Sequence, residues 1–497
     1  MLRLVDVAII AVYLIAMVAI GIACRGRQSD ENDYFTGGGG FSQVFGAILV
    51  GLSIAATFFS GISFLSYPSE VYKTGVTIVA GIVILPLGGL IVAYWFLPRY
   101  LKFGVREPYE IVERRFGYPT RAVAAMMFVL LRITWMGTLI YAPTVAVMAA
   151  AQLPESYFWP IVLTIGLTST FYTTLGGIRG VIVTDAIQFL VIAIGLVWPV
   201  AYVASHFPAP LSEAWSYLGD SDRLQWIKLS TDFREPYTIG SLVFGFMTAN
   251  LAIYIADQMS LQRYLASEDL QAARRAFAIN IAGVMIVIVL LALVGLSMAI
   301  WYGLATSRIP PEKADHVFPF FVASELPAGG PGLILAAILA ATMSSMTSGI
   351  NSLAGTLTLD LASRSGRLTT SAQRLAFGRW ASVAIGVLAT GVAGLVGKLG
   401  SIFEIAQATT GVFLGPLLAC VVLSVTRIAV RPWSMVVGMI AGSVVGWIVV
   451  ASNVYVLWVA PAAAAISFAA PLLVSSFDYV AGRNRIDDAT LASPDET

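Results

Sequence analysis

The chain has 497 residues, of which 58% are hydrophobic and 11% charged, and its net charge is +1. Soluble domains average about 45–50% apolar and about 25% charged residues, so this composition excludes a soluble globular protein and indicates a membrane protein with many spans. The charge gives no reason to expect a nucleic-acid partner. The scarcity of cysteine and histidine (Cys24, Cys420, His206 and His316) argues against a disulfide framework, a histidine metal site or an enzyme.

Long apolar runs recur from Val5 to Leu473. We predict about thirteen membrane spans of about 18–30 residues, against the roughly 20 that a helix needs to cross a bilayer. They lie near residues 5–24, 42–67, 74–98, 119–151, 157–175, 180–204, 237–262, 272–302, 327–362, 374–397, 400–426, 433–451 and 453–476. A cleaved signal peptide is the alternative for the first run, but only Arg3 precedes it and no convincing cleavage site follows. Because no polar block is large enough to fold alone, we expect one transmembrane domain, 1–480, and a cytoplasmic tail, 481–497.

Basic residues predict the orientation of these spans. One set of alternating loops holds 20 Lys and Arg residues, and the opposite set holds 8. Because cytoplasmic loops carry the excess of positive charge, we expect the amino terminus outside, the carboxyl terminus in the cytoplasm, and the protein in the plasma (inner) membrane. The long spans 119–151 and 327–362 would occupy matching places in two inverted halves, 42–204 and 237–426, which is a recurrent transporter plan.

Small and β-branched residues interrupt the second predicted span between Gly51 and Ser63. An unwound turn there would free backbone carbonyls to bind a cation. Close helix packing is the alternative, because it also uses glycine and serine.

Four ionisable side chains lie within or at the edge of predicted spans, where such residues are costly and mark functional sites. Arg132 is too deep to reach the membrane edge easily and needs a carbonyl, carboxylate or substrate partner. Asp185 either lines a site or pairs with Arg179. Asp257 either lines a site or caps its segment, and Glu404 either lines a site or faces the outer vestibule.

Hydroxyl residues crowd into the helix predicted near 327–362. Together with Ala341 and Asn351 they form two overlapping registers, each on one helix face: Ala341, Ser344, Ser345 and Ser348, and then Ser344, Thr347, Ser348 and Asn351. Oxygens packed this densely in a membrane helix suit a small hard cation such as Na⁺. The alternative is structural, because serine and threonine often bond to their own i−4 carbonyl or line tight helix contacts.

Several stretches match one known family in its order along the chain. They are Asp33-Tyr34-Phe35, Ala56 to Ser63, Leu175-Gly176-Gly177 with Thr184-Asp185, Asp257-Gln258 with Gln262-Arg263, Ser344-Ser345, Asn351-Ser352, and Gly411 to Pro416. Through them the chain resembles the sodium/solute symporters, which transport sugars, proline, sialic acid, iodide, vitamins and monocarboxylates. The resemblance implies an all-α, leucine-transporter-like fold, with a ten-helix inverted-repeat core plus extra helices, and transport driven by inward flow of Na⁺.

The resemblance also implies one or two Na⁺ sites. By position, the oxygens of the first site belong to Ala56, Phe59, Ala341, Ser344 and Ser345. Some members hold a second ion, and the matching residues here are Asp185, Ser345, Thr347 and Ser348.

The substrate region implied by the resemblance draws on several spans. Its candidate residues are Phe58, Ser60, Ser63, Ile82, Arg132, Trp135, Asp257 and Gln407. Sugar members have glutamine at the position of Ser63, and sialic acid members have arginine and glutamine at the positions of Trp135 and Ile82. Pro68 to Tyr72 and Ile140 to Pro143 resemble the branch that carries monocarboxylates, iodide and vitamins. A lightly polar site of this kind suits a small organic acid.

We therefore predict a Na⁺-coupled symporter for a small organic acid, working as a monomer in the lipid bilayer. A proline-type amino acid symporter and a sialic acid or sugar symporter are the alternatives within transport. A transport-like sensor and a passive channel are alternatives of other classes. The tail after Ser475 is too short to hold a kinase, and a channel would need no paired cation site.

Overall fold

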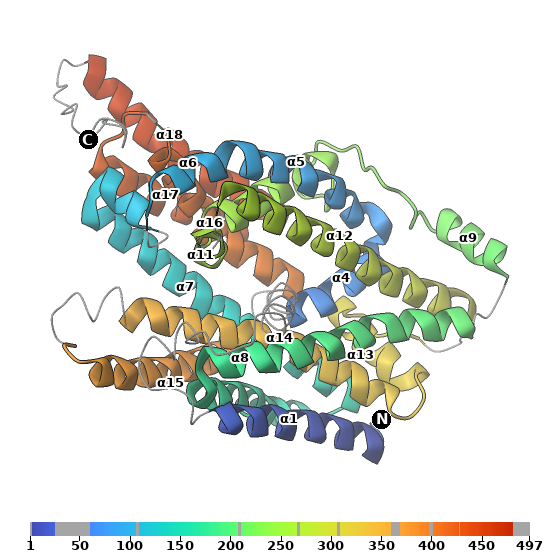
Figure 1. Cartoon of the computed structure of the whole chain (residues 1–497). Helices are drawn as coiled ribbons and strands as arrows, with labels where there is room; N and C mark the ends of the chain where they lie inside the picture. The colour runs from blue at the N-terminus through green and yellow to red at the C-terminus, as the bar shows by residue number, and fades with distance from the viewer. Residues whose placement is uncertain are drawn as a thin grey trace. The chain divides into compact units, whose positions relative to one another are not determined.

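The computed structural model describes residues 2–24, 60–105, 109–206, 210–265, 269–305, 309–358, 368–396, 401–426 and 428–480 (Figure 1). Every regular element within these ranges is a helix. A helix satisfies its backbone N–H and C=O groups internally, which hydrocarbon requires of any segment that crosses it. Eleven helical stretches among these residues are long and apolar enough to cross a membrane, and Ser241–Ile255 is a shorter apolar helix. The predicted all-α polytopic architecture is confirmed.

The described helices follow the predicted spans closely, with four differences. The predicted span 237–262 holds the shorter helix Ser241–Ile255, and a separate helix begins at Gln258. Gly61–Lys102 is one stretch that holds the end of the second predicted span and the whole third span. The predicted spans 157–175 and 180–204 lie in one helical element, within which two separate stretches are long enough to cross. The long helix Glu110–Ala151 begins before its predicted span, and Gly117, with a φ of 78°, breaks its regular backbone.

The chain divides into two compact units, each assembled from three separate segments. Unit 1 comprises residues 1–76, 132–225 and 286–405, and unit 2 comprises residues 77–131, 226–285 and 406–497. These units do not coincide with two sequential halves, so the inverted halves 42–204 and 237–426 stay a prediction.

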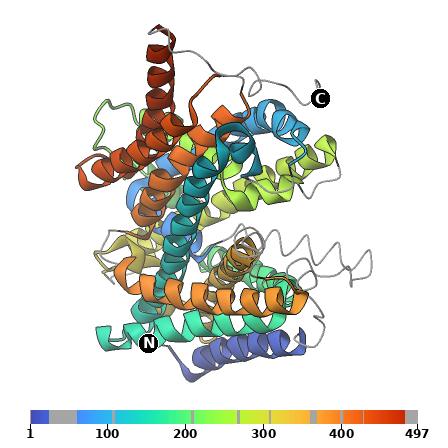
Figure 2. The same cartoon turned by 90° about the vertical axis from the view of Figure 1, so that its left-hand side faces the viewer.

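Unit 1 is built around one buried helix, α14. Its elements are α1 (Leu4–Cys24), α4 (Gly61–Thr74), the end of α7 (Glu110–Ala151), η4 (Glu155–Tyr157), α8 (Phe158–Ser205), α9 (Leu211–Asp220), the end of α12 (Leu270–Ile300), η6 (Trp301–Ala305), α13 (Ala314–Glu325), α14 (Gly330–Gly355) and α15 (Ser371–Val396). α14 is buried along nearly its whole length. It packs against α8, α1, α15, α4 and α13, and Figures 1 and 2 show α1, α8, α14 and α15 side by side.

Unit 2 holds the remaining helices. They are η2 (Gly75–Val83), α5 (Ile84–Leu90), η3 (Ile91–Phe96), α6 (Leu97–Lys102), η5 (Ser241–Phe246), α10 (Met247–Ile255), α11 (Gln258–Leu265), α16 (Ile402–Ser424), α17 (Pro432–Ala451), η8 (Val456–Trp458) and α18 (Val459–Val480), with the first parts of α7 and α12. η3 and η5 are π-helical turns within longer apolar helices. α17 and α18 pack closely, and Ser467 Oγ donates to the Gly438 carbonyl at 3.0 Å.

Candidate functional site

The hydroxyl residues of α14 lie in the core of unit 1. Ala341, Ser344 and Thr347 are wholly inaccessible to solvent, whereas Ser345 and Ser348 are half-buried. Each of the two registers predicted from the sequence therefore contains both buried and half-buried residues. The buried hydroxyls of Ser344 and Thr347 need partners inside the apolar core, because an unpaired buried polar group costs about 1–3 kcal/mol.

Ser344 lacks the structural partner that the packing interpretation requires. Among the described residues its buried Oγ has no hydrogen-bond partner, and the same is true of Oγ1 of Thr342, two residues earlier. Thr347, by contrast, donates from Oγ1 to the Ser344 carbonyl at 3.0 Å. A hydroxyl oxygen left in this condition fits a cation, which accepts lone pairs where the protein supplies no donor.

The start of α4 approaches this part of α14. Ser60 has an extended backbone and caps α4, with its Oγ accepting from Ser63 N at 3.3 Å. A Cβ at Gly61 would overlap Thr342 Oγ1 and lie 3.2 Å from the Ile338 carbonyl, so only glycine permits this approach. A helix thus begins inside the predicted span 42–67. The candidate residues Ala56, Phe58 and Phe59 lie outside the described residues.

Asp185 lies in α8, the helix that packs most extensively on α14, and is wholly buried. A buried carboxylate inside a membrane protein is costly unless it has a charged or polar partner. The hydroxyls of Tyr13 and Tyr172 lie within electrostatic range of it. The alternative pairing with Arg179 stays open, because that side chain is outside the described part. Asp185 and the α14 hydroxyls nevertheless belong to the same compact unit.

A polar network beside Asp185 was missed in the sequence. Gln188, one turn after Asp185, donates from Nε2 to Tyr13 Oη at 3.0 Å. Its nitrogen also lies 3.5 Å from Tyr172 Oη, and the Tyr172 hydroxyl lies close to the Thr347 side chain. The available signal was the spacing of Asp185 and Gln188, two polar residues on one face of an otherwise apolar helix.

The substrate candidates in unit 1 are Ser60, Ser63, Arg132 and Trp135. Ser60 Oγ and Ser63 Oγ are 3.3 Å apart, so the capping contact already uses one of the two hydroxyls. Arg132 and Trp135 lie one turn apart on α7, and both are half-buried. Each side chain is therefore partly accessible, as a substrate contact requires.

The candidates in unit 2 are Ile82, Asp257 and Gln407. Ile82 in η2 and Gln407 in α16 are half-buried. Asp257 is buried and caps α11, with its Oδ1 accepting from Met259 N at 2.9 Å. This is the capping role that the sequence left open for Asp257. Glu404 of unit 1 is exposed, and its Oε2 accepts from Ser401 N at 3.0 Å at the start of α16.

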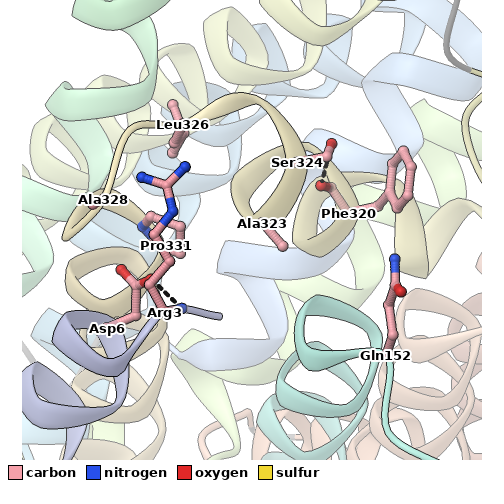
Figure 3. Close-up of a pocket in the computed structure, with 9 residues that line it drawn as sticks. All are labelled: Arg3, Asp6, Gln152, Phe320, Ala323, Ser324, Leu326, Ala328 and Pro331. Atoms are coloured by element: carbon pink, nitrogen blue, oxygen red, sulfur yellow. Dashed lines mark hydrogen bonds between the residues drawn. The ribbon is translucent and has the colours of Figure 1, made fainter. Parts of the chain in front are cut away.

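A cavity of about 340 Å³ opens at the amino-terminal ends of α1 and α14 (Figure 3). It is lined by Arg3, Asp6, Gln152, Phe320, Ala323, Ser324, Leu326, Ala328 and Pro331. The buried Asp6 carboxylate is already used, since it accepts from the backbone N–H groups of Gly329 at 2.9 Å and Gly332 at 3.1 Å. Thirteen residues of helix separate Pro331 from Ser344, which is about 20 Å, so the cavity is not part of the hydroxyl cluster.

The comparisons with known proteins agree on one class. A model of the sodium:solute symporter family matches residues 34–460. The chain is 30% identical over 381 residues to a sodium/sialic acid symporter of Aliivibrio fischeri, which covers 76% of this chain and 73% of that protein. It is 27% identical over 458 residues to the human sodium-coupled monocarboxylate transporter 1, which covers 90% of this chain and 74% of that protein.

Two solved structures resemble the fold. One is the substrate-bound outward-open state of a Na⁺-coupled sialic acid symporter, with a TM-score of 0.79, 25% identity and coverage of 96% of this chain and 98% of that one. The other is a nucleobase-cation-symport-1 family transporter in a closed conformation, with a TM-score of 0.51, 14% identity and coverage of 91% and 94%. The predicted leucine-transporter-like fold is confirmed, and these relatives and neighbours are transporters rather than enzymes.

Proposed function

Because the chain belongs to the sodium:solute symporter family, we propose that it imports a small organic acid together with one or two Na⁺ ions. The observation that carries the ion half of this proposal is the buried Ser344 Oγ without a hydrogen-bond partner. The first Na⁺ would bind the carbonyls of Ala56, Phe59 and Ala341 and the hydroxyls of Ser344 and Ser345. The second would bind Asp185 together with Ser345, Thr347 and Ser348. Those of these positions that the structure describes all belong to unit 1.

The proposed ions would act by joining two segments. Na⁺ held between the chain before Gly61 and the middle of α14 would fix the start of α4 against α14. Binding of the ion would shift the population toward the outward-open conformation. Release of the ion to the cytoplasm would shift it toward the inward-open conformation. The membrane potential adds about 2.3 kcal/mol per charge per 100 mV to the driving force, so each coupled Na⁺ strengthens substrate accumulation.

A carboxylate-bearing substrate suits the candidates on α7. Arg132 is a half-buried guanidinium one turn from Trp135, and arginine recognises carboxylates in a bidentate geometry. The similarity of this chain to family members that carry monocarboxylates, vitamins and iodide supports a small solute as its substrate. The remaining substrate contacts that we propose are Phe58, Ser60, Ser63, Ile82, Trp135, Asp257 and Gln407.

Sialic acid is the second candidate substrate, because two sialic acid symporters and a solved sialic acid symporter are among the similar proteins. Sialic acid itself carries a carboxylate, so a monocarboxylate and sialic acid would both offer a negative charge to the Arg132 guanidinium. The residues that argue against it are Trp135 and Ile82, which replace the arginine and glutamine of sialic acid members.

Uptake into proteoliposomes tests the substrate. Labelled monocarboxylates, sialic acid, proline and sugars are offered with an inward Na⁺ gradient or with K⁺ on both sides. We expect Na⁺ to stimulate uptake of a monocarboxylate, with Arg132→Gln weakening its apparent affinity. Stimulated uptake of sialic acid alone would select the second candidate, and a transported solute that ignores Na⁺ would overturn the symporter proposal.

Two variants test the ion sites. Ser345→Ala should raise the Na⁺ concentration for half-maximal uptake, since it removes an oxygen ligand from both proposed sites. Asp185→Ala should lower the number of Na⁺ ions transported per substrate from two to one. An unchanged Na⁺ dependence in Ser345→Ala would show that the assignment of the first site is wrong. An unchanged ion count in Asp185→Ala would remove the second site.

A further inference from the structure

Gln188 connects the amino-terminal helix α1 to the ion-binding helix α14. Its side chain is wholly buried, and its Nε2 lies 3.0 Å from Tyr13 Oη and 3.5 Å from Met17 Sδ, both in α1. A thioether sulfur can only accept a hydrogen bond, so the amide nitrogen faces α1. The orientation of the amide is therefore set by its neighbours.

The contacts continue from the two tyrosines to α14. Because Gln188 donates to Tyr13 Oη, Tyr13 keeps its own proton for another acceptor. Tyr13 Oη donates to Met343 Sδ at 3.7 Å. Tyr172, buried beside Gln188, lies close to the Thr347 side chain. Met343 directly precedes Ser344, so the network reaches α14 on both sides of that residue.

The opposite end of the Gln188 amide has no such partner. Its Oε1 is buried and makes no hydrogen bond within the described part of the chain, although an unpaired buried acceptor costs about 1–3 kcal/mol. Gln188 follows Asp185 by one helical turn, so both project from one face of α8. If this position served packing alone, a leucine would give a more stable fold, because it has no oxygen to leave unpaired. The buried amide lowers the stability, which indicates that its fixed orientation has a role.

We propose that Gln188 and Tyr13 are positioning residues of the second Na⁺ site, through which α1 takes part in ion coupling; this rests on the proposed function of that site. Gln188 holds Tyr172 and thereby the rotamer of Thr347, a proposed ligand. Tyr13 holds Gln188 and Met343, and so fixes α8 against α14. Outer groups of this kind commonly change the metal affinity of a site by about tenfold or more when removed.

α1 also contacts the beginning of α14, which supports a role in holding that helix. The Asp6 carboxylate accepts from two backbone N–H groups at the start of α14, and a carboxylate at a helix amino terminus is stabilising. A Cβ at Gly21 would overlap Tyr172, so α1 lies directly on the tyrosine that is next to Thr347. Contacts at both ends of α1 thus lead to the same ion-binding helix.

Direct measurement of Na⁺ binding tests the proposal without knowledge of the substrate. Radioactive Na⁺ is titrated onto the purified full chain, with K⁺ keeping the ionic strength constant. The variants are Tyr13→Phe, which removes one oxygen, and Gln188→Leu, which removes the amide. Tyr109→Phe is the matched control, since Tyr109 Oη is buried and donates to the Ala256 carbonyl at 2.9 Å in unit 2.

We expect Tyr13→Phe and Gln188→Leu to weaken binding of one of two ions by about tenfold and to leave the other ion unchanged. Tyr109→Phe should bind both ions as the wild type does. A general loss of packing would weaken both ions together, so the split between them separates positioning from structure. If Gln188→Leu fails to fold, Tyr13→Phe alone decides, because it changes the shape of the core very little.

Asp185→Ala in the same assay separates the two proposals. If the wild type binds two ions and Asp185→Ala binds one, the second site stands. Wild-type-like binding by Tyr13→Phe and Gln188→Leu would then overturn the positioning role alone. If the wild type binds one ion and Asp185→Ala changes nothing, the second site and its positioning residues are both rejected.

Discussion

Two contacts in unit 1 place a threonine against a glycine of a neighbouring helix, and they differ in hydrogen bonding. Between α8 and α15 the contact is reciprocal, since a Cβ at Gly166 would overlap Thr390 and a Cβ at Gly386 would overlap Thr170. Each threonine donates from Oγ1 to the glycine carbonyl one turn earlier on its own helix, at 2.7 Å. These hydroxyls are satisfied, and their role is packing.

The contact between α4 and α14 has the same shape without the same bond. Gly61 meets Thr342 as closely as the other glycines meet their threonines, yet neither Thr342 Oγ1 nor Ser344 Oγ makes a hydrogen bond to any residue that the structure describes. Small residues beside hydroxyls therefore do not distinguish packing from binding. Hydrogen bonding distinguishes these two contacts: Thr170 and Thr390 donate to the i−4 carbonyl, as packing hydroxyls often do, whereas Thr342 Oγ1 has no partner among the described residues.

Enlarging the glycines gives the largest expected effect. Gly61→Ala and Gly386→Ala each force a methyl into an occupied position, which costs about 1–3 kcal/mol of stability. We expect both to lower the melting temperature of the detergent-solubilised protein. Only Gly61→Ala should also weaken Na⁺ binding, because it moves α4 away from α14. Equal Na⁺ affinities in the two variants would break the distinction between the contacts.

Removing one serine hydroxyl from α14 and one from α15 tests the same distinction between the two contacts more finely. Ser344→Ala should raise the Na⁺ concentration for half-maximal binding by about tenfold, equivalent to about 1.4 kcal/mol. The matched variant is Ser382→Ala in α15, whose buried Oγ donates to the Gly378 carbonyl at 2.9 Å. It should leave Na⁺ binding unchanged. Similar shifts in Ser344→Ala and Ser382→Ala would mean that both hydroxyls act through packing.

Replacing threonine by valine keeps the volume and should give opposite signs in the two contacts. Thr390→Val removes a satisfied hydrogen bond and should destabilise by about 1 kcal/mol. Thr342→Val removes a buried hydroxyl without a partner, and should stabilise the Na⁺-free protein. Thermal unfolding in K⁺ buffer measures both. Destabilisation by both variants would show that Thr342 has a structural partner.

The smallest expected effect concerns pH, and it tests a carboxyl group of unit 1 that lies outside α14. Burial raises the pKa of the half-buried Asp315, which accepts from Ile402 N at 3.0 Å. His316 and Lys73 oppose this rise and Glu404 adds to it. A raised acid pKa favours the folded state most below the unfolded value of 3.8, and this stability is lost as the pH rises through the folded value.

Asp315→Asn should therefore melt higher than the wild type at pH 7, because the neutral amide still offers an oxygen to Ile402 N. The difference should shrink as the pH falls toward 4, where the wild-type carboxyl becomes protonated. A thermal-unfolding series across this range measures it. A difference that does not vary with pH would assign the effect to the hydrogen bond rather than to the charge.

The helices and the hydroxyl cluster could be predicted because they depend on local pattern. Apolar runs of sufficient length must form helices in hydrocarbon, and the spacing of Ser344, Thr347 and Ser348 places them on one face of any helix. The predicted alternatives for Asp257 were also local, and its capping of α11 follows from its position before that helix. Assignment to the family likewise followed from short motifs in order.

Tyr13 and Gln188 could not be paired from the sequence, because 175 residues separate them. A polar residue in an apolar span shows that a partner is required, but nothing in the spacing shows which helix supplies it. The same limit applied to Thr342 and Thr390, whose sequence surroundings are equally small and apolar. Their hydrogen bonding depends on side-chain rotamers selected by the neighbouring helix.

By itself, the sequence determined that the chain is a polytopic helical membrane protein, which family it resembles, and which helix holds the candidate ion ligands. Hydropathy and the helical repeat act over one or two turns, so they can be read without a fold. Only the tertiary structure decided which hydroxyls are satisfied and that α1 bonds to the partners of Asp185. These properties arise where separate helices meet, because whether a buried polar atom finds its partner depends on the packing of both.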